Sequence, residues 1–229
     1  MSNLTKKELH DIIQWDVKTW SKCLKFWEQN TRIEEGMKAL AIGEREGGLS
    51  LWLAMKGLKV DCTDYRDFPD TTKSMHVEYG VQANISYQEG VDVTDLSRYP
   101  EHSFDIVVFK SVIGALTEKE RQKKALNEIY RVLKPGGSLI FAENLKGTKL
   151  HVKLRKKFIR WNTYWRYLDL KKDQDLFEKY AKKTFKTAGF LANFGRSEGQ
   201  RSFLAFWDKL NLWWIPKSWR YVLFGVLEK

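Results

Sequence analysis

The stretch Ala39-Leu40-Ala41-Ile42-Gly43-Glu44-Arg45-Glu46-Gly47-Gly48-Leu49-Ser50-Leu51-Trp52-Leu53-Ala54 predicts a short buried strand, a glycine-containing turn and a helix that begins near Gly48. A strand that ends in such a turn brings main-chain N–H groups and a helix N-terminus to one point, which favours the negative or polar end of a nucleotide-like ligand. Turns of this kind are also ordinary strand-to-helix connections, so the stretch alone leaves both interpretations open.

Two further strands follow at spacings that favour a nucleotide site. Residues 57–64 predict a second strand that ends at Asp64, 21 residues after Gly43. A carboxylate at that position can accept hydrogen bonds from a ribose diol. Residues 85–96 predict a third strand and place a second acid, Asp92, near its carboxyl end.

The next two segments add a buried strand and a distinctive turn. Residues 104–111 predict a fourth strand without a charge from Ile106 to Phe109, as in a strand buried on both faces. Residues 128–143 predict a helix, a Pro-Gly-Gly turn and a fifth strand. Together the chain from about residue 37 to residue 143 resembles the class I S-adenosylmethionine-dependent methyltransferases. Within that class it is similar to bacterial small-molecule methyltransferases, including those that modify surface polysaccharides.

This resemblance implies an α/β fold of the Rossmann-like class I methyltransferase type, with S-adenosyl-L-methionine as the cofactor. The expected sheet has seven mostly parallel strands with helices on both faces, and its last strand lies antiparallel between the fifth and the sixth. The resemblance also implies that Asp64 binds the ribose, that Asp92 and Val93 bind the adenine, and that Lys110 lies near the transferred methyl group. The other cofactor contacts that we expect are Gly43, Glu44, Gly47 and Tyr65.

Two residues depart from the pattern of the family. Ala41 stands where an acid usually helps to hold the methionine amino group, and Arg45 stands where a glycine usually fits a tight main chain. Glu44 or Glu46 could partly replace the lost carboxylate. These departures put the affinity for the cofactor in doubt more than they threaten the fold.

The 229 residues and 27.0 kDa predict a single methyltransferase domain. The expected parts are an N-terminal helical cover (1–35), a cofactor-binding core (36–144), a basic aromatic lid inserted after the fifth strand (145–172), and a C-terminal helix with strands (173–229) that contains an aromatic insertion (200–219). No apolar run is long enough to cross a bilayer and no signal peptide begins the chain, which predicts a cytoplasmic protein. Cys23 and Cys62 lack metal-ligand spacing, so we expect reduced structural cysteines and no metal.

Segments outside the core supply the candidate substrate contacts. Residues 9–29 predict one covering helix, in which Trp20 could shape the acceptor pocket. Between residues 146 and 172 ten basic residues accompany one acid, and aromatic side chains lie among them. The segment could be a lid for an anionic acceptor or a solvated basic helix with an aromatic inner face. On the first interpretation we expect substrate contacts from Arg155, Tyr164 and Trp165. Residues 173–188 predict a helix ahead of the sixth strand.

Candidate catalytic groups are few. Methyl transfer from a sulfonium is an in-line displacement that chiefly needs the nucleophile to be held in place. A neutral hydroxyl would also need a general base, whereas an anionic oxygen would not. His151 in the basic segment is the first candidate for this base, and Glu143 at the end of the fifth strand is the second.

The net charge of +11 and the ten tryptophans attract nucleic acid, anionic lipid headgroups or an anionic small substrate. Residues 109–112 lack the signature of enzymes that methylate exocyclic nitrogens of DNA bases. We therefore expect methyl transfer to an oxygen of a small anionic acceptor: a sugar, a sugar nucleotide, or a phospho or phosphoramidate intermediate of surface-glycan (capsule or lipopolysaccharide) biosynthesis. The alternatives are an RNA methyltransferase and a non-catalytic binding module. Residues 200–219 could cover the site, contact a second copy in a homodimer, or lie in a membrane interface.

Overall fold

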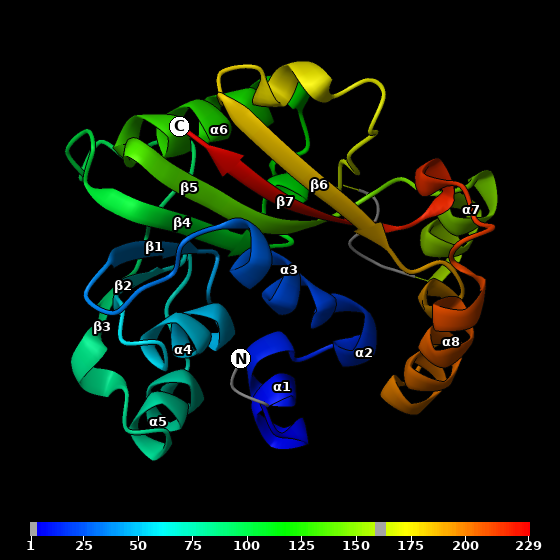
Figure 1. Ribbon diagram of the computed structural model, residues 1–229, viewed down its shortest axis with the longest axis horizontal. Helices are drawn as coiled ribbons and strands as arrows, with labels where there is room; N and C mark the ends of the chain where they lie inside the picture. The colour runs from blue at the N-terminus through cyan, green and yellow to red at the C-terminus, as the bar shows by residue number, and fades with distance from the viewer. Residues whose placement is uncertain (1–3, 159–163) are drawn as a thin grey trace.

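The computed structural model describes residues 4–158 and 164–229, and its centre is one seven-stranded sheet (Figure 1). The strand order is β3-β2-β1-β4-β5-β7-β6. The strands are β1 (Lys38–Ile42), β2 (Lys59–Thr63), β3 (Ile85–Gln88), β4 (Phe104–Lys110), β5 (Leu133–Asn144), β6 (Lys182–Ala188) and β7 (Val222–Glu228). Only β7 runs antiparallel to its neighbours, and it lies between β5 and β6. The predicted Rossmann-like class I methyltransferase fold is confirmed.

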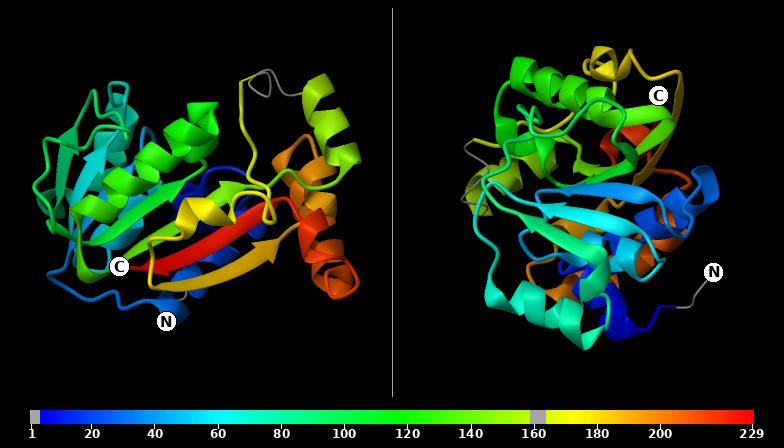
Figure 2. Two further views of the ribbon diagram at one scale, coloured as in Figure 1. Left: turned by 90° about the horizontal axis from the view of Figure 1, so that it is seen from above. Right: turned by 90° about the vertical axis from the view of Figure 1, so that its left-hand side faces the viewer.

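Helices cover both faces of this sheet (Figure 2). The helices of the described residues are α1 (Lys6–Ile13), α2 (Val17–Trp20), α3 (Lys22–Asn30), α4 (Gly48–Ala54), α5 (Asp70–Glu78), α6 (Lys119–Val132), α7 (Lys149–Phe158) and α8 (Glu198–Asn211), and the last two lie beyond the end of the sheet (Figure 1). Alternate strand residues serve opposite faces: Ala39 and Ala41 belong to the core under α3 and α4, and Leu40 and Ile42 belong to the core under α6. No helix in the described parts of the chain is long and apolar enough to cross a membrane.

The parallel strands end in register, which fixes where a ligand can lie. Ile42 at the end of β1 pairs with Thr63 of β2 on one side and with Phe109 of β4 on the other. The residues that follow these strand ends therefore meet at one edge of the sheet. In open α/β sheets this carboxyl edge is the usual place for ligands.

The N-terminal cover differs from the single helix that we predicted for residues 9–29. It consists of α1, α2 and α3, because the chain turns sharply where Gln14 and Asp16 have positive φ angles of 70° and 46°. The carboxylate of Glu198 accepts hydrogen bonds from the N–H groups of Asp16 and Val17 at 2.8 Å each, which satisfies donors that a continuous helix would have used. Helical spacing of apolar residues continues on both sides of the turn, so the pattern hid the break.

The helix predicted for residues 173–188 is also wrong. A single 3-10 turn at Gln174–Phe177 is followed by strand β6. This strand lies at the edge of the sheet and leaves Lys182, Lys183 and Lys186 exposed, a feature that protects an edge from pairing with another chain. The segment predicted as an aromatic insertion before the last strand (200–219) contains most of α8.

Candidate functional site

Two glycines shape the loop between β1 and α4. Gly43 and Gly47 both have a φ of +69°, a conformation that glycine adopts without strain. The buried ring of His76 holds this loop, because its Nε2 lies 2.9 Å from the carbonyl oxygen of Gly47. Arg45, the residue that departs from the family pattern, is exposed and has no positive φ, so the loop accepts it without strain.

Glu44 is buried under this loop. Its carboxylate accepts a hydrogen bond of 2.9 Å from the N–H of Ser50 in the first turn of α4. Burial raises the pKa of Glu44 to about 7, although the Ser50 N–H and the Lys110 ammonium act in the opposite direction. The carboxylate therefore acts as a cap of α4, where a helix N-terminus favours negative charge.

Lys110 at the end of β4 joins the sheet to the N-terminal cover. Its Nζ donates a hydrogen bond of 2.8 Å to the carbonyl oxygen of Ile13 and lies 5.1 Å from the ring centre of Trp15. Burial lowers the pKa of Lys110 to about 8, and the Glu44 carboxylate opposes that shift. The Lys110 side chain thus holds the cover through the Ile13 carbonyl oxygen and interacts electrostatically with Glu44.

These groups line one cavity of about 320 Å³, which we call the loop cavity. Its walls are the glycine loop, the end of β4, the cover and the segment predicted as a lid: Ile12, Gln14, Trp15, Gly43, Glu44, Arg45, Glu46, Gly47, Lys110, Ser111, Tyr164 and Trp165. The structure therefore brings Tyr164 and Trp165, which we predicted as substrate contacts, to the same cavity as four of the predicted cofactor contacts. Residues 159–163 of the predicted lid lie outside the described residues.

The predicted ribose and adenine contacts lie beyond this cavity, along the same edge of the sheet. Asp64 follows β2 directly, and its Oδ1 accepts a hydrogen bond of 2.8 Å from the N–H of Arg66. Asp92 is linked to it through the main chain, because the N–H of Val91 donates to the carbonyl oxygen of Asp64 at 3.0 Å. Tyr65 is 72% exposed and Val93 is buried. The Asp92 carboxylate lies 3.8 Å from the exposed guanidinium of Arg121.

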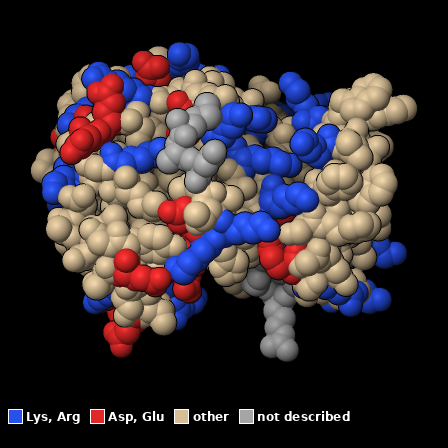
Figure 3. All heavy atoms as spheres, turned by 60° about the horizontal axis from the view of Figure 1, so that its bottom comes forward, with Lys and Arg blue, Asp and Glu red and all other residues tan. Residues whose placement is uncertain are grey.

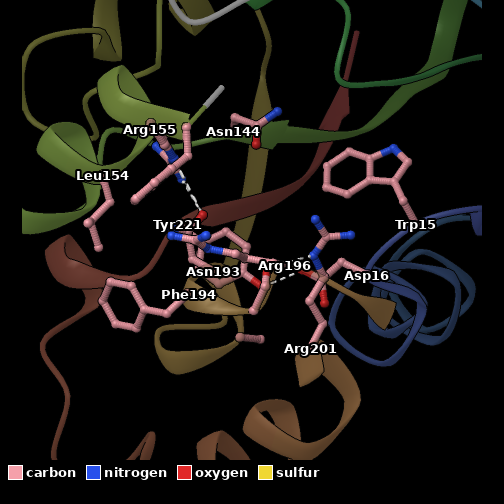
Figure 4. A pocket seen from close by; sticks show the side chains of 13 residues that line it. Trp15, Asp16, Asn144, Leu154, Arg155, Asn193, Phe194, Arg196, Arg201 and Tyr221 are labelled. Atoms are coloured by element: carbon pink, nitrogen blue, oxygen red, sulfur yellow. Dashed lines mark hydrogen bonds between the residues drawn. The ribbon is translucent and has the colours of Figure 1, made fainter. Parts of the chain in front are cut away.

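A second and larger cavity of about 670 Å³ opens beside the first, and we call it the arginine cavity (Figure 4). Trp15 lines both cavities. The other lining residues come from α7, α8, the 3-10 turn Leu191–Phe194 and the ends of β5 and the cover: Asp16, Asn144, Leu154, Arg155, Phe158, Ala192, Asn193, Phe194, Gly195, Arg196, Arg201 and Tyr221. Three arginines thus face one space next to the loop cavity.

Arg155 is the most deeply buried of these arginines, at 3% exposed. It donates to the carbonyl oxygen of Leu145 at 2.8 Å and to Oδ1 of Asn193 at 3.2 Å, and its guanidinium lies 4.4 Å from the ring centre of Tyr167. Within residues 4–158 and 164–229 it forms no ion pair with a carboxylate, and burial lowers its pKa. A buried cation held only by neutral groups favours an anion in the adjoining cavity.

Asp16 is a carboxylate on the wall of this cavity that sequence reasoning missed. The Tyr221 hydroxyl donates a hydrogen bond to Asp16 Oδ2. Burial raises the pKa of Asp16 to about 6, against the effect of that hydrogen bond. The two residues are 205 positions apart, and Asp16 lies in the turn that the sequence pattern hid, so only the structure brings them together.

Three predicted site residues have packing roles in the structure. His151 is buried, its Nε2 lies 3.0 Å from the Phe190 carbonyl oxygen and its Nδ1 accepts from the Thr148 N–H at 3.1 Å. Glu143 is buried and accepts from the N–H groups of Val112 and Asn144 at 2.9 and 2.8 Å, which holds the loop after β4. Trp20 is fully buried in the core. Their contacts therefore support neither a catalytic base nor a substrate contact.

Comparison with known proteins agrees with this architecture. Residues 40–141 match the family model described as a methyltransferase domain. This part of the chain is thus similar to methyltransferase domains.

Curated relatives are similar to parts of the chain. The ubiquinone/menaquinone biosynthesis C-methyltransferase UbiE of Hydrogenovibrio crunogenus is 39% identical over 70 residues, which is 31% of this chain and 26% of that protein. The arsenite methyltransferase of Aquipseudomonas alcaligenes is 33% identical over 87 residues, or 35% of this chain and 24% of that protein. The matches to these relatives span about a quarter of their length.

Solved structures share the fold over most of the chain. A Haemonchus contortus phosphoethanolamine N-methyltransferase 2 complex with S-adenosylhomocysteine superposes with a TM-score of 0.65 at 18% identity, covering 92% of this chain and 52% of that one. The YcgJ protein of Bacillus subtilis gives a TM-score of 0.64 at 16% identity, covering 91% and 98%.

Proposed function

We propose that this protein transfers a methyl group from S-adenosylmethionine to an oxygen of a small anionic acceptor, such as a phosphorylated or carboxylated sugar derivative. The observation that carries the proposal is the buried Arg155 guanidinium, whose partners among the described residues are all neutral and which faces the arginine cavity beside Arg196 and Arg201. The curated relatives are named for transfer to other atoms, so the oxygen acceptor is our assignment from this chain.

The residues of the loop cavity fit the cofactor. Gly43 and Gly47 form the main-chain turn that lines this cavity, and Asp64 and Asp92 follow at the same edge with carboxylate oxygens for a ribose and an adenine amine. Ala41 is fully buried, and its methyl side chain offers no carboxylate to the methionine end of the cofactor. Gly43, Glu44, Gly47 and Lys110 would surround that end, with Asp64, Tyr65, Asp92 and Val93 along the nucleoside.

The bound cofactor supplies an electrophilic methyl group on a sulfonium. The protein's task is then to hold the acceptor oxygen in line with the breaking bond and to exclude water. In the proposal, the three arginines bind the anionic part of the acceptor, and Trp15 lies between the two cavities. Burial raises the pKa of Asp16 to about 6, close to the value that suits a proton acceptor from a hydroxyl.

Calorimetric titration with S-adenosylmethionine and S-adenosylhomocysteine tests the cofactor first. Labelled methyl transfer to sugar phosphates, sugar nucleotides, neutral sugars and RNA then tests the acceptor class. We expect transfer to the anionic small molecules, and an Arg155→Met variant should raise KM for them by roughly tenfold to a hundredfold. Lys153→Ala, an exposed lysine on the same helix, is the matched control. Transfer to neutral sugars or RNA alone would overturn the acceptor class, and cofactor binding without any transfer would favour a binding module.

A further inference from the structure

The outer face of α8 and the segment after it carry an unusual concentration of exposed aromatic side chains. Among the described residues fourteen large apolar side chains are exposed, and seven of them lie between residues 203 and 219: Phe203, Phe206, Trp207, Leu210, Trp213, Trp214 and Trp219. Trp213 and Trp214 are 77% and 69% exposed. We call these seven the aromatic face. An exposed apolar patch of this kind marks an interaction site.

The attachment of α8 explains why its aromatic side points outward. Asp208 is fully buried beneath the helix, where its carboxylate accepts hydrogen bonds from the N–H groups of Phe190, Leu191 and Ala192. The side of α8 that faces the protein is thus fixed by a charged group, with the small Ala205 beside it. The orientation leaves all seven side chains of the aromatic face exposed, with Trp219 stacked on Phe190 and Phe206 beside Lys18.

The charge around the aromatic face is positive. Between Glu198 and Glu228 the only acid is the buried Asp208, whereas Lys209 and Lys217 are exposed. Lys18 lies 5.4 Å from the ring centre of Phe206. Helix α7 lies on the same side of the molecule as α8 and adds exposed lysines together with Leu150 and Phe158 (Figures 1 and 3). Aromatic side chains bordered by lysines match a lipid interface, where tryptophan lies at headgroup depth and lysine meets anionic phosphate.

We infer that the aromatic face docks on the surface of an anionic phospholipid bilayer. Charge complementarity selects this occupant over a second copy of the chain. A symmetric contact between two copies would bring Lys209 and Lys217 close to like charges, in a chain whose net charge is +11. Anionic headgroups neutralise the same lysines. This docking does not depend on the proposed methyl transfer. Because Arg201 of α8 and Phe158 of α7 line the arginine cavity, docking through this side of the molecule would bring that cavity close to the lipid.

Co-sedimentation of the full chain with sucrose-loaded vesicles tests the inference. We expect binding to phosphatidylcholine vesicles that contain phosphatidylglycerol, weakened by added salt, and little binding to phosphatidylcholine alone. The variant Trp213→Ala/Trp214→Ala should bind at least roughly tenfold more weakly, because two exposed indoles no longer enter the interface. The variant Lys209→Glu/Lys217→Glu should lose the preference for anionic vesicles. Both variants alter exposed side chains, and Val77→Ala, an exposed apolar residue on α5, is the control.

Three results would overturn the docking. They are failure to bind anionic vesicles, equal binding by the tryptophan variant and the unaltered protein, and equal binding to both kinds of vesicle. Light scattering without vesicles measures the oligomeric state and so tests the alternative partner, a second copy of the chain. A dimer that is lost in the tryptophan variant, in a protein that ignores vesicles, would assign the aromatic face to a second copy.

Discussion

A Cβ atom on Gly48 would lie 2.2 Å from the carbonyl oxygen of Ile12, so the end of α1 rests directly on the first residue of α4. The N-terminal cover can close over the loop cavity only because this position has no side chain. The close approach gives the glycine a packing role that is separate from the conformational role of Gly43 and Gly47.

Gly48→Ala should therefore displace the cover. We expect a loss of stability of about 1–3 kcal/mol from the overlap with main-chain atoms, together with weaker cofactor binding. Urea unfolding and calorimetry measure the two effects. Gly199→Ala is the matched control, because Gly199 lies in α8 with no atom within 4 Å of an added Cβ, and alanine there should leave stability equal or higher. Equal stability of the two variants would contradict the role given to Gly48.

Asp64→Ala should weaken binding of S-adenosylhomocysteine by roughly tenfold to a hundredfold, since a charged acceptor for the ribose hydroxyls is lost. Asp67→Ala removes an exposed carboxylate three residues further on and should leave the affinity unchanged. Titration calorimetry of both variants gives the comparison. An affinity that falls equally in both would mean that general charge, and not a ribose contact, controls binding.

Asp16→Asn should lower kcat by roughly a hundredfold or more if the acceptor is a hydroxyl, because general-base catalysis typically contributes that much. Tyr221→Phe is the paired variant. It keeps the carboxylate but removes a hydrogen bond that lowers the pKa of Asp16, so the acid limb of the pH–rate profile should move to higher pH. An Asp16→Asn variant with an unchanged kcat would remove Asp16 from the reaction.

Glu143 should make folding stability fall as pH rises. Burial raises the pKa of Glu143 to about 7 from its ordinary 4.5, so the folded protein binds this proton more tightly than the unfolded chain does. The stability it contributes is full below pH 4.5 and is lost as pH rises toward 7, by about 3 kcal/mol. Glu143→Gln should flatten the pH dependence of the free energy of unfolding over this window. The exposed Glu118→Gln should reproduce the unaltered curve.

His151 should affect stability and not the pH dependence of the reaction. Burial lowers its pKa to about 4, so the ring is neutral in the folded protein and its contribution to stability is lost as pH falls from 6.5 toward 4. His151→Gln should lower the melting temperature at neutral pH and leave both limbs of the pH–rate profile in place. The exposed His10→Gln is its control. Loss of one limb of the pH–rate profile in the His151→Gln variant would instead support His151 as a catalytic base.

Most of the sheet was predictable because its signals are local. The apolar run at 39–42, the glycine turn and the uncharged stretch at 106–109 each determine their own structure through burial on both faces. The predictions failed where contacts between residues far apart in the sequence determine the local structure. Edge strand β6 alternates lysine with threonine and phenylalanine in a way that also satisfies a helix, and the break after α1 depends on Glu198, more than 180 residues away.

The candidate site shows the same difference between local signals and contacts that are distant in the sequence. Residues that follow strand ends, such as Gly43 and Asp64, could be placed from their spacing. Arg155 could be named from the charge of its segment, but its burial could not. Asp16 carried no signal at all, because its role depends on Tyr221 in a part of the chain that gives no local hint of it.

The contact between Asp16 and Tyr221 also determines when the N-terminal cover can become ordered during synthesis of the chain. The cover is made first, yet its partners Glu198 and Tyr221 leave the ribosome among the last residues. Contacts separated by so much sequence form late, because the intervening loop must first be ordered. A growing chain therefore holds a finished glycine loop before it has a fixed cover, and Phe26 of α3 lacks its ring contact with Phe224 until the last strand arrives. Synthesis that stops before Tyr221 would leave the cover without this contact and open to chaperones and proteases.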